Sequence, residues 1–472
     1  MCYIKGMCDK DAYIKKLEQE NEELRKLLRE QEIRIQQLER LVKQNSRNSS
    51  KPPSSDFGQN KQSDKNKNKK KNKRKRKQGA QKGHKPNFKQ LVPKEDVTQF
   101  IDLIPEQCTC GCHDLKESTE PPLRFQTINI PPIKAKVIEY AQHMRECKQC
   151  GNVVYKPLPD NIKRNVFGPG VLAVVGIMTG MLNTSKRKAL EVINEVFHVP
   201  MSLGGLSNCE AKIAAAMESP YNDLVDYVNS QERAHADESG WPRGNNLKGW
   251  LWAMCCTSAA IFMINARRTQ DAARELLGYF SGILNSDRWS GYNIYNHVRQ
   301  ICWAHLKRDF IAISESKGKL GQIGKEQSEL CKTIFELYHR ARDGDIKWQT
   351  FQRRMIYYEA AIEKLLSKGS VCEGPLAGKC REILKHRAHL WTFVRNPQVE
   401  PTNNAAEQII RQAVLWRRTS FGTKSKRGAL YVERMLTVCS TCRLQDRSII
   451  EYLRKACYCH ANNRSVPNLR PK

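Results

Sequence analysis

A lysine-rich tract divides this chain into parts that cannot share one hydrophobic core. Between residues 65 and 77, ten of the thirteen side chains are Lys or Arg. Such a block repels itself and has no apolar surface to bury, so it stays disordered until a polyanion neutralises it. The flanking sequence is polar as well, and large apolar residues are scarce there. We therefore expect a disordered basic linker over residues 46–94, between an N-terminal segment and the folded remainder.

The net charge indicates a polyanionic partner. The chain has 80 Lys and Arg against 49 Asp and Glu, a formal charge of +31. Residues 51–85 carry fourteen positive and two negative charges, or +12, so +19 remains for the rest of the chain. A basic excess of this size favours nucleic acid as the partner. A membrane-surface role is disfavoured, because no amphipathic or lipidated anchor accompanies the lysine tract.

The hydrophobic residues, 40% of the chain, argue against full disorder and against a membrane protein. The longest uncharged stretches, residues 167–185 and 249–266, are interrupted by small or polar residues, and a spanning helix needs about 20 mostly apolar ones. No apolar signal core occupies the first ten residues. We expect a cytoplasmic, nucleoid-associated protein whose thiols are reduced.

The N-terminal segment has a heptad pattern. Apolar residues alternate at spacings of three and four between Ile14 and Val42, flanked by Glu, Lys, Arg and Gln. This pattern predicts a coiled coil over residues 10–45, with Asn21 at a position that selects register and strand number. The alternative is a single amphipathic helix that packs on the chain's own body. We favour self-association into a homo-oligomer.

One dense group of cysteines predicts a structural zinc site in a small β-rich module over residues 95–160. Cys147 and Cys150 have the two-residue spacer with which two thiolates bind one tetrahedral metal ion. The other half offers three sulfurs, and which two of them bind is open. The candidate ligands are four of the five residues Cys108, Cys110, Cys112, Cys147 and Cys150. Isolated cysteines such as Cys255, Cys302 and Cys439 are interpreted as core residues.

Residues 161–230 are interpreted as helical. Two amphipathic segments joined by a short turn with glycines resemble a helix-turn-helix, which predicts a DNA-binding region. A purely structural helical bundle fits the same pattern equally well.

Three acidic residues form a candidate catalytic set. Asp237 and Asp287 each end an apolar, strand-like run, and Glu407 lies near the start of a helix for which Asn403 is a candidate N-cap. Each has an ordinary alternative as a turn residue or a surface ion-pair partner. Together, three carboxylates can bind two Mg²⁺ ions for phosphoryl transfer.

Basic residues gather after Glu407, next to this set. We expect them to contact DNA phosphates, with a solvated basic helix face as the alternative. Trp416 and Phe421 could stack on bases, although burial fits Trp416 better. The predicted DNA-binding residues are Arg411, Arg417, Arg418, Lys424, Lys426 and Arg427.

Several motifs resemble the transposases of bacterial insertion sequence family 66 over nearly the whole chain. The resemblance rests on the string Asn48–Asp56, the segments 79–84, 237–240, 286–292 and 302–308, and Asn403–Glu407 after them. It implies a multidomain α/β protein with an RNase H-like catalytic core over residues 231–440, a helical insertion at about 311–395 and a C-terminal helical segment at 441–472. It also implies that Asp237, Asp287 and Glu407 are the Asp-Asp-Glu catalytic triad. Cys302 and His305 match another element of the family, for which we expect a core or substrate-positioning role rather than a catalytic one.

The resemblance implies a DNA transposase that binds transposon ends and target DNA as double strands. It would carry out Mg²⁺-dependent strand cleavage and transfer, with possible help from accessory proteins of the same element. A non-catalytic, zinc-containing DNA-binding protein derived from a transposase is the alternative. A metal-dependent nuclease with the same triad is a third possibility, which strand joining would distinguish.

Overall fold

The computed structural model describes residues 3–49, 91–159, 162, 166–244 and 247–471, with only the backbone described for residues 3–12. The predicted disordered linker therefore falls largely outside the described residues. The chain divides into two units, of which the first combines Met1–Gly58 with Ala135–Lys472 and the second is Gln59–Lys134. Each unit is described separately.

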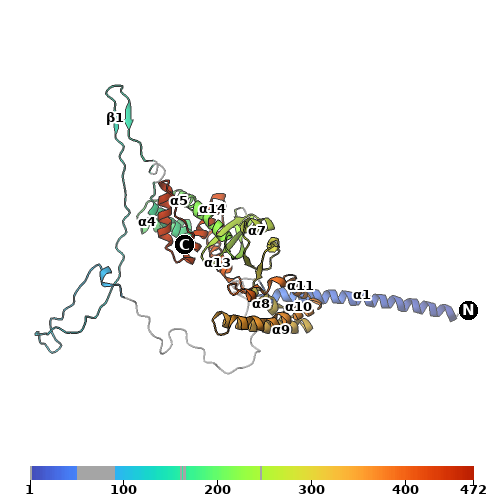
Figure 1. Cartoon of the computed structure of the whole chain (residues 1–472). Coiled ribbons are helices and arrows are strands. Elements are labelled where there is room, and N and C mark those ends of the chain that lie inside the picture. The colour runs from blue at the N-terminus through green and yellow to red at the C-terminus, as the bar shows by residue number, and fades with distance from the viewer. Residues whose placement is uncertain (1–2, 50–90, 160–161, 163–165, 245–246, 472) are drawn as a thin grey trace. The chain divides into compact units, whose positions relative to one another are not determined.

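A mixed sheet forms the centre of the first unit (Figure 1). The strand order is β5-β4-β3-β6-β7, and β4 alone runs antiparallel to the other four. The predicted α/β class is confirmed, and the apolar run at 250–266 forms a hairpin. The five strands are β3 (Arg233–Arg243), β4 (Leu247–Cys255), β5 (Ala260–Asn265), β6 (Ile283–Ser286) and β7 (Arg299–Ile301).

Side chains of other elements cover both edges of this sheet. At β5, the backbone N–H of Phe262 donates to Thr437 Oγ1 at 3.0 Å, and the N–H of Ala260 donates to Thr441 Oγ1 at 3.1 Å. At β7, the Thr392 hydroxyl donates to the carbonyl of Arg299 at 2.5 Å. Exposed edges pair readily with other strands, so these contacts protect the sheet from aggregation.

Helices precede and follow the sheet in sequence and share one hydrophobic core with it. Several begin at a Ser or Thr whose hydroxyl accepts a backbone N–H, as at Ser202, where Oγ accepts from Gly205 at 3.0 Å. Phe421 ends α13 in the left-handed conformation, with φ of 56°. These elements are α3 (Pro169–Val175), the π-helix η3 (Gly176–Met181), α4 (Lys186–Glu195), α5 (Leu203–Ala216), α6 (Glu218–Asn229), α7 (Gln270–Leu277), the 3-10 helix η4 (Ser290–Ile294), α13 (Asn404–Ser420), α14 (Lys426–Leu444) and α15 (Ile449–Ala461).

The stretch between β7 and α13 is helical and has a hydrophobic core of its own. Trp303, Phe351 and Phe393 are fully buried there. Its elements are α8 (Trp303–Ser314), α9 (Gly318–Arg342), α10 (Trp348–Ser370), α11 (Ala377–Lys385), the 3-10 helix η5 (Arg387–His389) and α12 (Thr392–Arg395).

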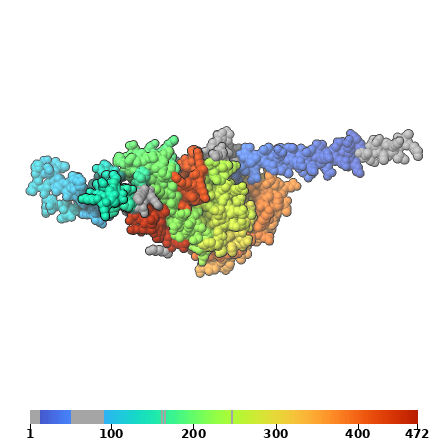
Figure 2. All heavy atoms as spheres, turned by 90° about the horizontal axis from the view of Figure 1, so that it is seen from above, coloured from blue at the N-terminus to red at the C-terminus, as the bar shows by residue number. Residues whose placement is uncertain are grey.

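The N-terminal segment is one long helix, α1 (Tyr3–Lys43). Its apolar stripe is solvent-exposed over the residues whose side chains are described, with Leu28 at 65% and Val42 at 79%. Figure 2 shows this helix, in blue, extending from the rest of the first unit. The stripe does not pack on the chain's own body, and the coiled coil stays a prediction.

The prediction of a β-rich module over residues 95–160 is wrong for the described residues, which have little regular structure because most of their side chains are exposed and share no core. Only β1 (Met144–Glu146) and β2 (Val153–Tyr155) pair, as an antiparallel hairpin, and the second unit's described part contains the short 3-10 helix η2 (Lys94–Asp96). No helix in the described part of the chain combines the length and apolarity needed to cross a membrane.

Candidate active site

Asp237 lies in the middle of β3, opposite Ala253 of β4, so the prediction that it ends a strand is wrong. The strand continues because residues up to Arg243 pair with β4. Because side chains alternate along a strand, Ala236 and Glu238 point to one face and Asp237 to the other. The Asp237 carboxylate accepts the backbone N–H of Glu238 at 2.9 Å. Burial raises the pKa of Asp237 well above its usual value. The carboxylates of Asp287 and Glu407 are near enough to add to this rise.

Asp287 follows the last residue of β6, directly beside Asp237. In the parallel ladder, Ala234 pairs with Leu284 and His235 with Asn285, a constant offset of 50 residues. The ladder ends at His235 and Asn285, two residues before Asp237 and Asp287, which have the same separation. Neighbouring strands lie about 4.8 Å apart, and paired residues of parallel strands face the same side. The sheet therefore brings the two aspartates together.

Asn403 connects the third acidic residue to the same strand. Its amide donates to the carbonyl of Ala236 at 2.8 Å, and its Oδ1 lies 3.1 Å from His235 Nδ1. Asn403 occupies the predicted N-cap position of α13, but its side chain makes no capping bond. It is buried and binds β3 instead, so the first turn of α13, with Glu407, lies beside Asp237.

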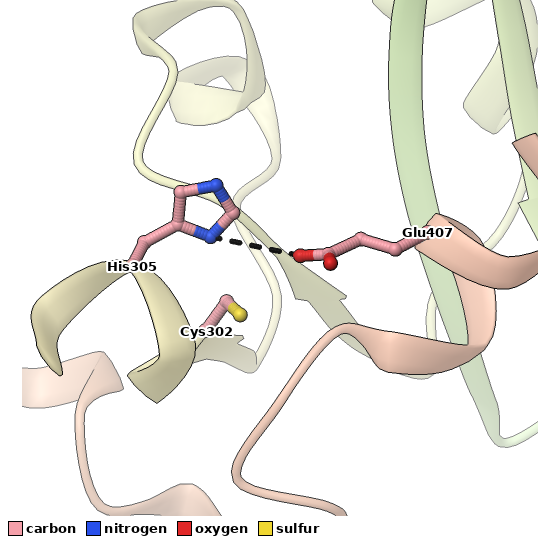
Figure 3. A group of neighbouring side chains, drawn as sticks. All are labelled: Cys302, His305 and Glu407. Atoms are coloured by element: carbon pink, nitrogen blue, oxygen red, sulfur yellow. Dashed lines mark ion pairs between the residues drawn. The ribbon is translucent and has the colours of Figure 1, made fainter. Parts of the chain in front are cut away.

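The Glu407 carboxylate has an unsatisfied buried atom. Its Oε1 has no hydrogen-bond partner. His305 Nδ1 lies 3.9 Å from this oxygen (Figure 3), and the Arg308 guanidinium Nη2 lies 4.0 Å from it, so both are beyond hydrogen-bond distance. A buried acceptor without a donor is costly unless a cation or water completes it. Asp287 and Glu407 both repel Asp237, and carboxylates with an orphaned oxygen are the ligand type of a divalent cation such as Mg²⁺. The ligand atoms of these three acids do not all lie within 4.8 Å of one another.

Burial lowers the pKa of His305, and the positive charge of Arg308 lowers it further. Burial also raises the pKa of the Cys302 thiol to about 11, although hydrogen bonds from backbone N–H groups lower it in part. Cys302, which precedes α8, accepts the backbone N–H of Asn403 on Sγ at 3.2 Å. These two residues, for which we expected a core or substrate-positioning role, lie beside the same helix start as Glu407.

A small pocket opens beside Asp287, with a volume of about 280 Å³. The helical insertion contributes to it through Glu382 and His386. Asp309 of α8 fixes this arrangement, because it pairs with both Arg288, next to Asp287, and Lys379 of α11. The lining residues are Asp287, Arg288, Trp289, His305, Glu382 and His386.

The opposite face of β3 carries a buried polar network that sequence reasoning missed. Tyr292 donates to Glu238 Oε2 at 2.7 Å, and Arg268 Nε donates to Glu238 Oε1 at 2.8 Å. The Arg268 guanidinium lies 4.5 Å from the Trp289 ring centre. Trp289 and Tyr292 thus have structural roles in the segment after Asp287.

Close packing at Gly291 yields a first prediction. A Cβ there would lie 1.9 Å from Trp289 Cζ3. Gly291→Ala should therefore displace the ring beneath Asp287 and destabilise the protein by about 1–3 kcal/mol in chemical denaturation. The control is Gly378→Ala in α11, where the nearest atom is the flexible end of Arg381 at 3.7 Å, so no loss is expected. Equal effects of the two substitutions would contradict the packing argument.

The predicted DNA-contacting residues differ in their surroundings. Arg417 is half-buried and donates to Ser239 Oγ at 3.0 Å, so its guanidinium stabilises β3. Arg427 donates to the carbonyl of Ser207 at 2.7 Å yet stays exposed. Trp416 is buried, as expected, whereas Phe421 is 82% exposed. The other four are exposed side chains, Arg411, Arg418, Lys424 and Lys426.

Backbone bonds hold the loop after α13 against the end of β3. Thr423 N–H donates to the carbonyl of Pro242, and Gly244 N–H donates to the carbonyl of Thr423, both at 3.0 Å. Gly422 has φ of 86°, and a Cβ there would collide with the Pro242 carbonyl. The loop thus presents Phe421 and Lys424 at a defined place.

Each half of the predicted zinc site forms a tight turn. Gly151 N–H donates to the Cys147 carbonyl, and Gly111 N–H donates to the Cys108 carbonyl, both at 2.8 Å. Backbone N–H groups lower the pKa of the Cys147 and Cys108 thiols, which favours thiolates. The halves fall in different units, and zinc binding stays a prediction. Cys255, Cys302 and Cys439 are buried, as predicted.

Comparisons with known proteins agree with these features. The family model described as "Transposase IS66 family" matches residues 165–431, more than half of the chain. A second model, a family of unknown function, matches residues 9–90. Two uncharacterized proteins of Sinorhizobium fredii are similar. The protein y4hP is 25% identical over 72% of this chain and 68% of its own length, and y4jD is 20% identical over 70% of each.

Proposed function

This chain belongs to the IS66 transposase family, and from that membership we propose that it is a DNA transposase with an Asp-Asp-Glu active site. Asp237, Asp287 and Glu407 would hold two Mg²⁺ ions. Bound there, the ions would supply Lewis-acid activation of the attacking oxygen and charge stabilisation of the leaving one. The observation that carries the proposal is the position of Asp237 on β3, next to the strand β6 that Asp287 follows, beside the unsatisfied oxygen of Glu407.

The strand order supports an RNase H-like core. Three parallel strands, β3, β6 and β7, lie to one side of an antiparallel β4, which pairs with β5 at the edge. In an RNase H-like core of this kind, Asp237 on β3 and Asp287 after β6 would share the active site with Glu407 from the later helix α13. The long helical stretch before α13 corresponds to the expected insertion, and its pocket residues lie next to Asp287.

DNA binding would involve the exposed basic residues after Glu407. Arg418 and Lys424 flank Phe421, whose exposed ring is suited to stacking on an unpaired base. Arg417 is a weaker candidate, because its guanidinium already binds β3. The α4–α5 pair and the cysteine-rich module would recognise transposon ends. The exposed stripe of α1 would pair protomers, because a solvated apolar stripe of this length gains stability in a coiled coil.

A strand-transfer assay on the element's own end sequences tests the function. We expect Mg²⁺-dependent cleavage and joining by the wild type, with accessory proteins of the element supplied. Asp287→Ala should abolish both steps and retain end binding. The matched control is Asp271→Ala, an exposed residue of α7 paired with Arg274, which should keep full activity.

Other outcomes separate the alternatives. Cleavage without joining would favour a metal-dependent nuclease. Tight end binding without cleavage, with accessory proteins supplied, would favour a non-catalytic DNA-binding protein derived from a transposase.

A further inference from the structure

A second group of potential metal ligands, distinct from the predicted zinc module, shares one residue with the proposed Asp-Asp-Glu set. Among the residues that the structure describes, Cys302, His305 and Glu407 form the one group of three such side chains whose ligand atoms all lie within 4.8 Å of one another. Cys302 precedes α8, His305 lies in its first turn and Glu407 faces them from α13 (Figure 3). Two of the three belong to a motif that the proposed reaction does not use.

Two facing atoms of this group are buried and unpartnered. His305 Nδ1 and Glu407 Oε1 both lack a hydrogen-bond partner. They lie 3.9 Å apart, too far for a direct hydrogen bond. Two ligands at about 2.0–2.1 Å from a tetrahedral ion are separated by about 3.3 Å, so a small inward movement would let one cation satisfy both.

The sulfur completes a suitable donor set. Cys302 and His305 have the two-residue spacer of metal half-sites, so both side chains lie on the same side of the helix start. The Asn403 N–H donates a hydrogen bond to Sγ, and this hydrogen bond becomes stronger when the sulfur is a thiolate. Thiolate and imidazole ligands favour Zn²⁺ and similar ions over Mg²⁺.

We propose that Cys302, His305 and Glu407 bind a borderline-soft divalent cation of the Zn²⁺ or Co²⁺ class. Three protein ligands leave a fourth position open to water. Binding releases the thiol proton to solvent. Arg308, whose Nη2 lies 4.0 Å from Glu407 Oε1, supplies positive charge there without the metal. Its side chain is partly exposed, so it can turn to solvent when a cation binds.

The proposal has a regulatory consequence that rests on the proposed transposase function. Glu407 is shared between this site and the carboxylate set of Asp237 and Asp287. A soft cation held by the sulfur and the imidazole withdraws Glu407 from that set. Excess Zn²⁺ is therefore expected to inhibit Mg²⁺-dependent strand transfer.

Cobalt binding by the full-length protein, without DNA, tests the site independently of activity. We expect the wild type to bind one more Co²⁺ per chain than Cys302→Ser, with a stronger thiolate-to-cobalt charge-transfer band. The matched control is Cys380→Ser, another fully buried cysteine, which should bind as the wild type does. His305→Gln provides a second variant if Cys302→Ser fails to fold, and it should also lose one Co²⁺.

Equal cobalt stoichiometry and spectra in the wild type, Cys302→Ser and His305→Gln would overturn the proposal. Loss of one Co²⁺ in the variants would support the metal site even if the wild type transferred no strands, an outcome that would count against the proposed function alone.

Discussion

Glu407→Gln is expected to reduce strand transfer at least about 100-fold, because metal ligation supplies several kcal/mol of transition-state stabilisation. The same substitution should leave the metal-free protein as stable or slightly more stable. The Glu407 carboxylate has an orphaned buried oxygen and repels Asp237, whose pKa it helps to raise. A neutral amide of the same shape relieves that repulsion, and residues that serve a site often cost stability in this way.

Strand-transfer rates and thermal melting without Mg²⁺ would check both halves of this expectation. The matched control is Glu336→Gln on the surface of α9, where the carboxylate lies 3.8 Å from Lys332. It should change activity little and stability within about 0.5 kcal/mol. Retained transfer by Glu407→Gln would remove Glu407 from the proposed metal ligands.

The second large effect is a loss of stability in the buried network of Glu238, Arg268 and Tyr292, which lies on the face of β3 opposite Asp237. Arg268→Met should destabilise the protein by about 3 kcal/mol, because Glu238 is left as a buried carboxylate without its cation. Burial already raises the pKa of Glu238, and Arg268 opposes that rise. A raised acid pKa means that the folded state binds more protons than the unfolded one, so stability falls as pH increases through this range. Loss of Arg268 should deepen that fall.

The penalty of Arg268→Met should therefore be larger at about pH 8 than at about pH 5, where Glu238 is closer to protonation. Urea denaturation at both pH values measures it. Adding Glu238→Gln should rescue most of the loss. Arg274→Met removes an exposed pair with Asp271 and should cost less than about 0.5 kcal/mol. A penalty independent of pH would show that Arg268 acts through packing.

Local patterns were sufficient for β6 and α13, which carry Asp287 and Glu407, but not for β3, which continues six residues beyond the strand end predicted at Asp237. The apolar run before Asp287 forms β6, and α13 begins at Asn404, next to the predicted cap. Local pattern could not reveal that Asn403 binds β3, because its partner Ala236 lies 167 residues away. The same limit hid Arg268 and Tyr292, which meet Glu238 only once the sheet forms.

The charge pattern of the sequence also could not show which basic residues are free of contacts with the rest of the protein and which are not. Arg417 and Arg418 are neighbours in the sequence, but the helix turns the first toward β3 and the second toward solvent. The Cys302–His305 spacing was the one sequence signal for the second metal group. Its third member, Glu407, enters from a helix about a hundred residues later, so no local motif contains all three.

The helical insertion leaves and rejoins the sheet domain almost at a single point. Trp303 N–H donates to the carbonyl of Pro401 at 2.8 Å, and Asn403 N–H meets Cys302 Sγ. Its entry and exit lie side by side and it has a core of its own, so this helical stretch folds around side chains that it supplies itself. Its contacts with Arg288 and Arg299 hold it against the sheet. A designer who grafts a different helical cap at the same two positions must therefore keep a partner for Arg288 and a cover for the edge of β7, which Asp309 and Thr392 supply here.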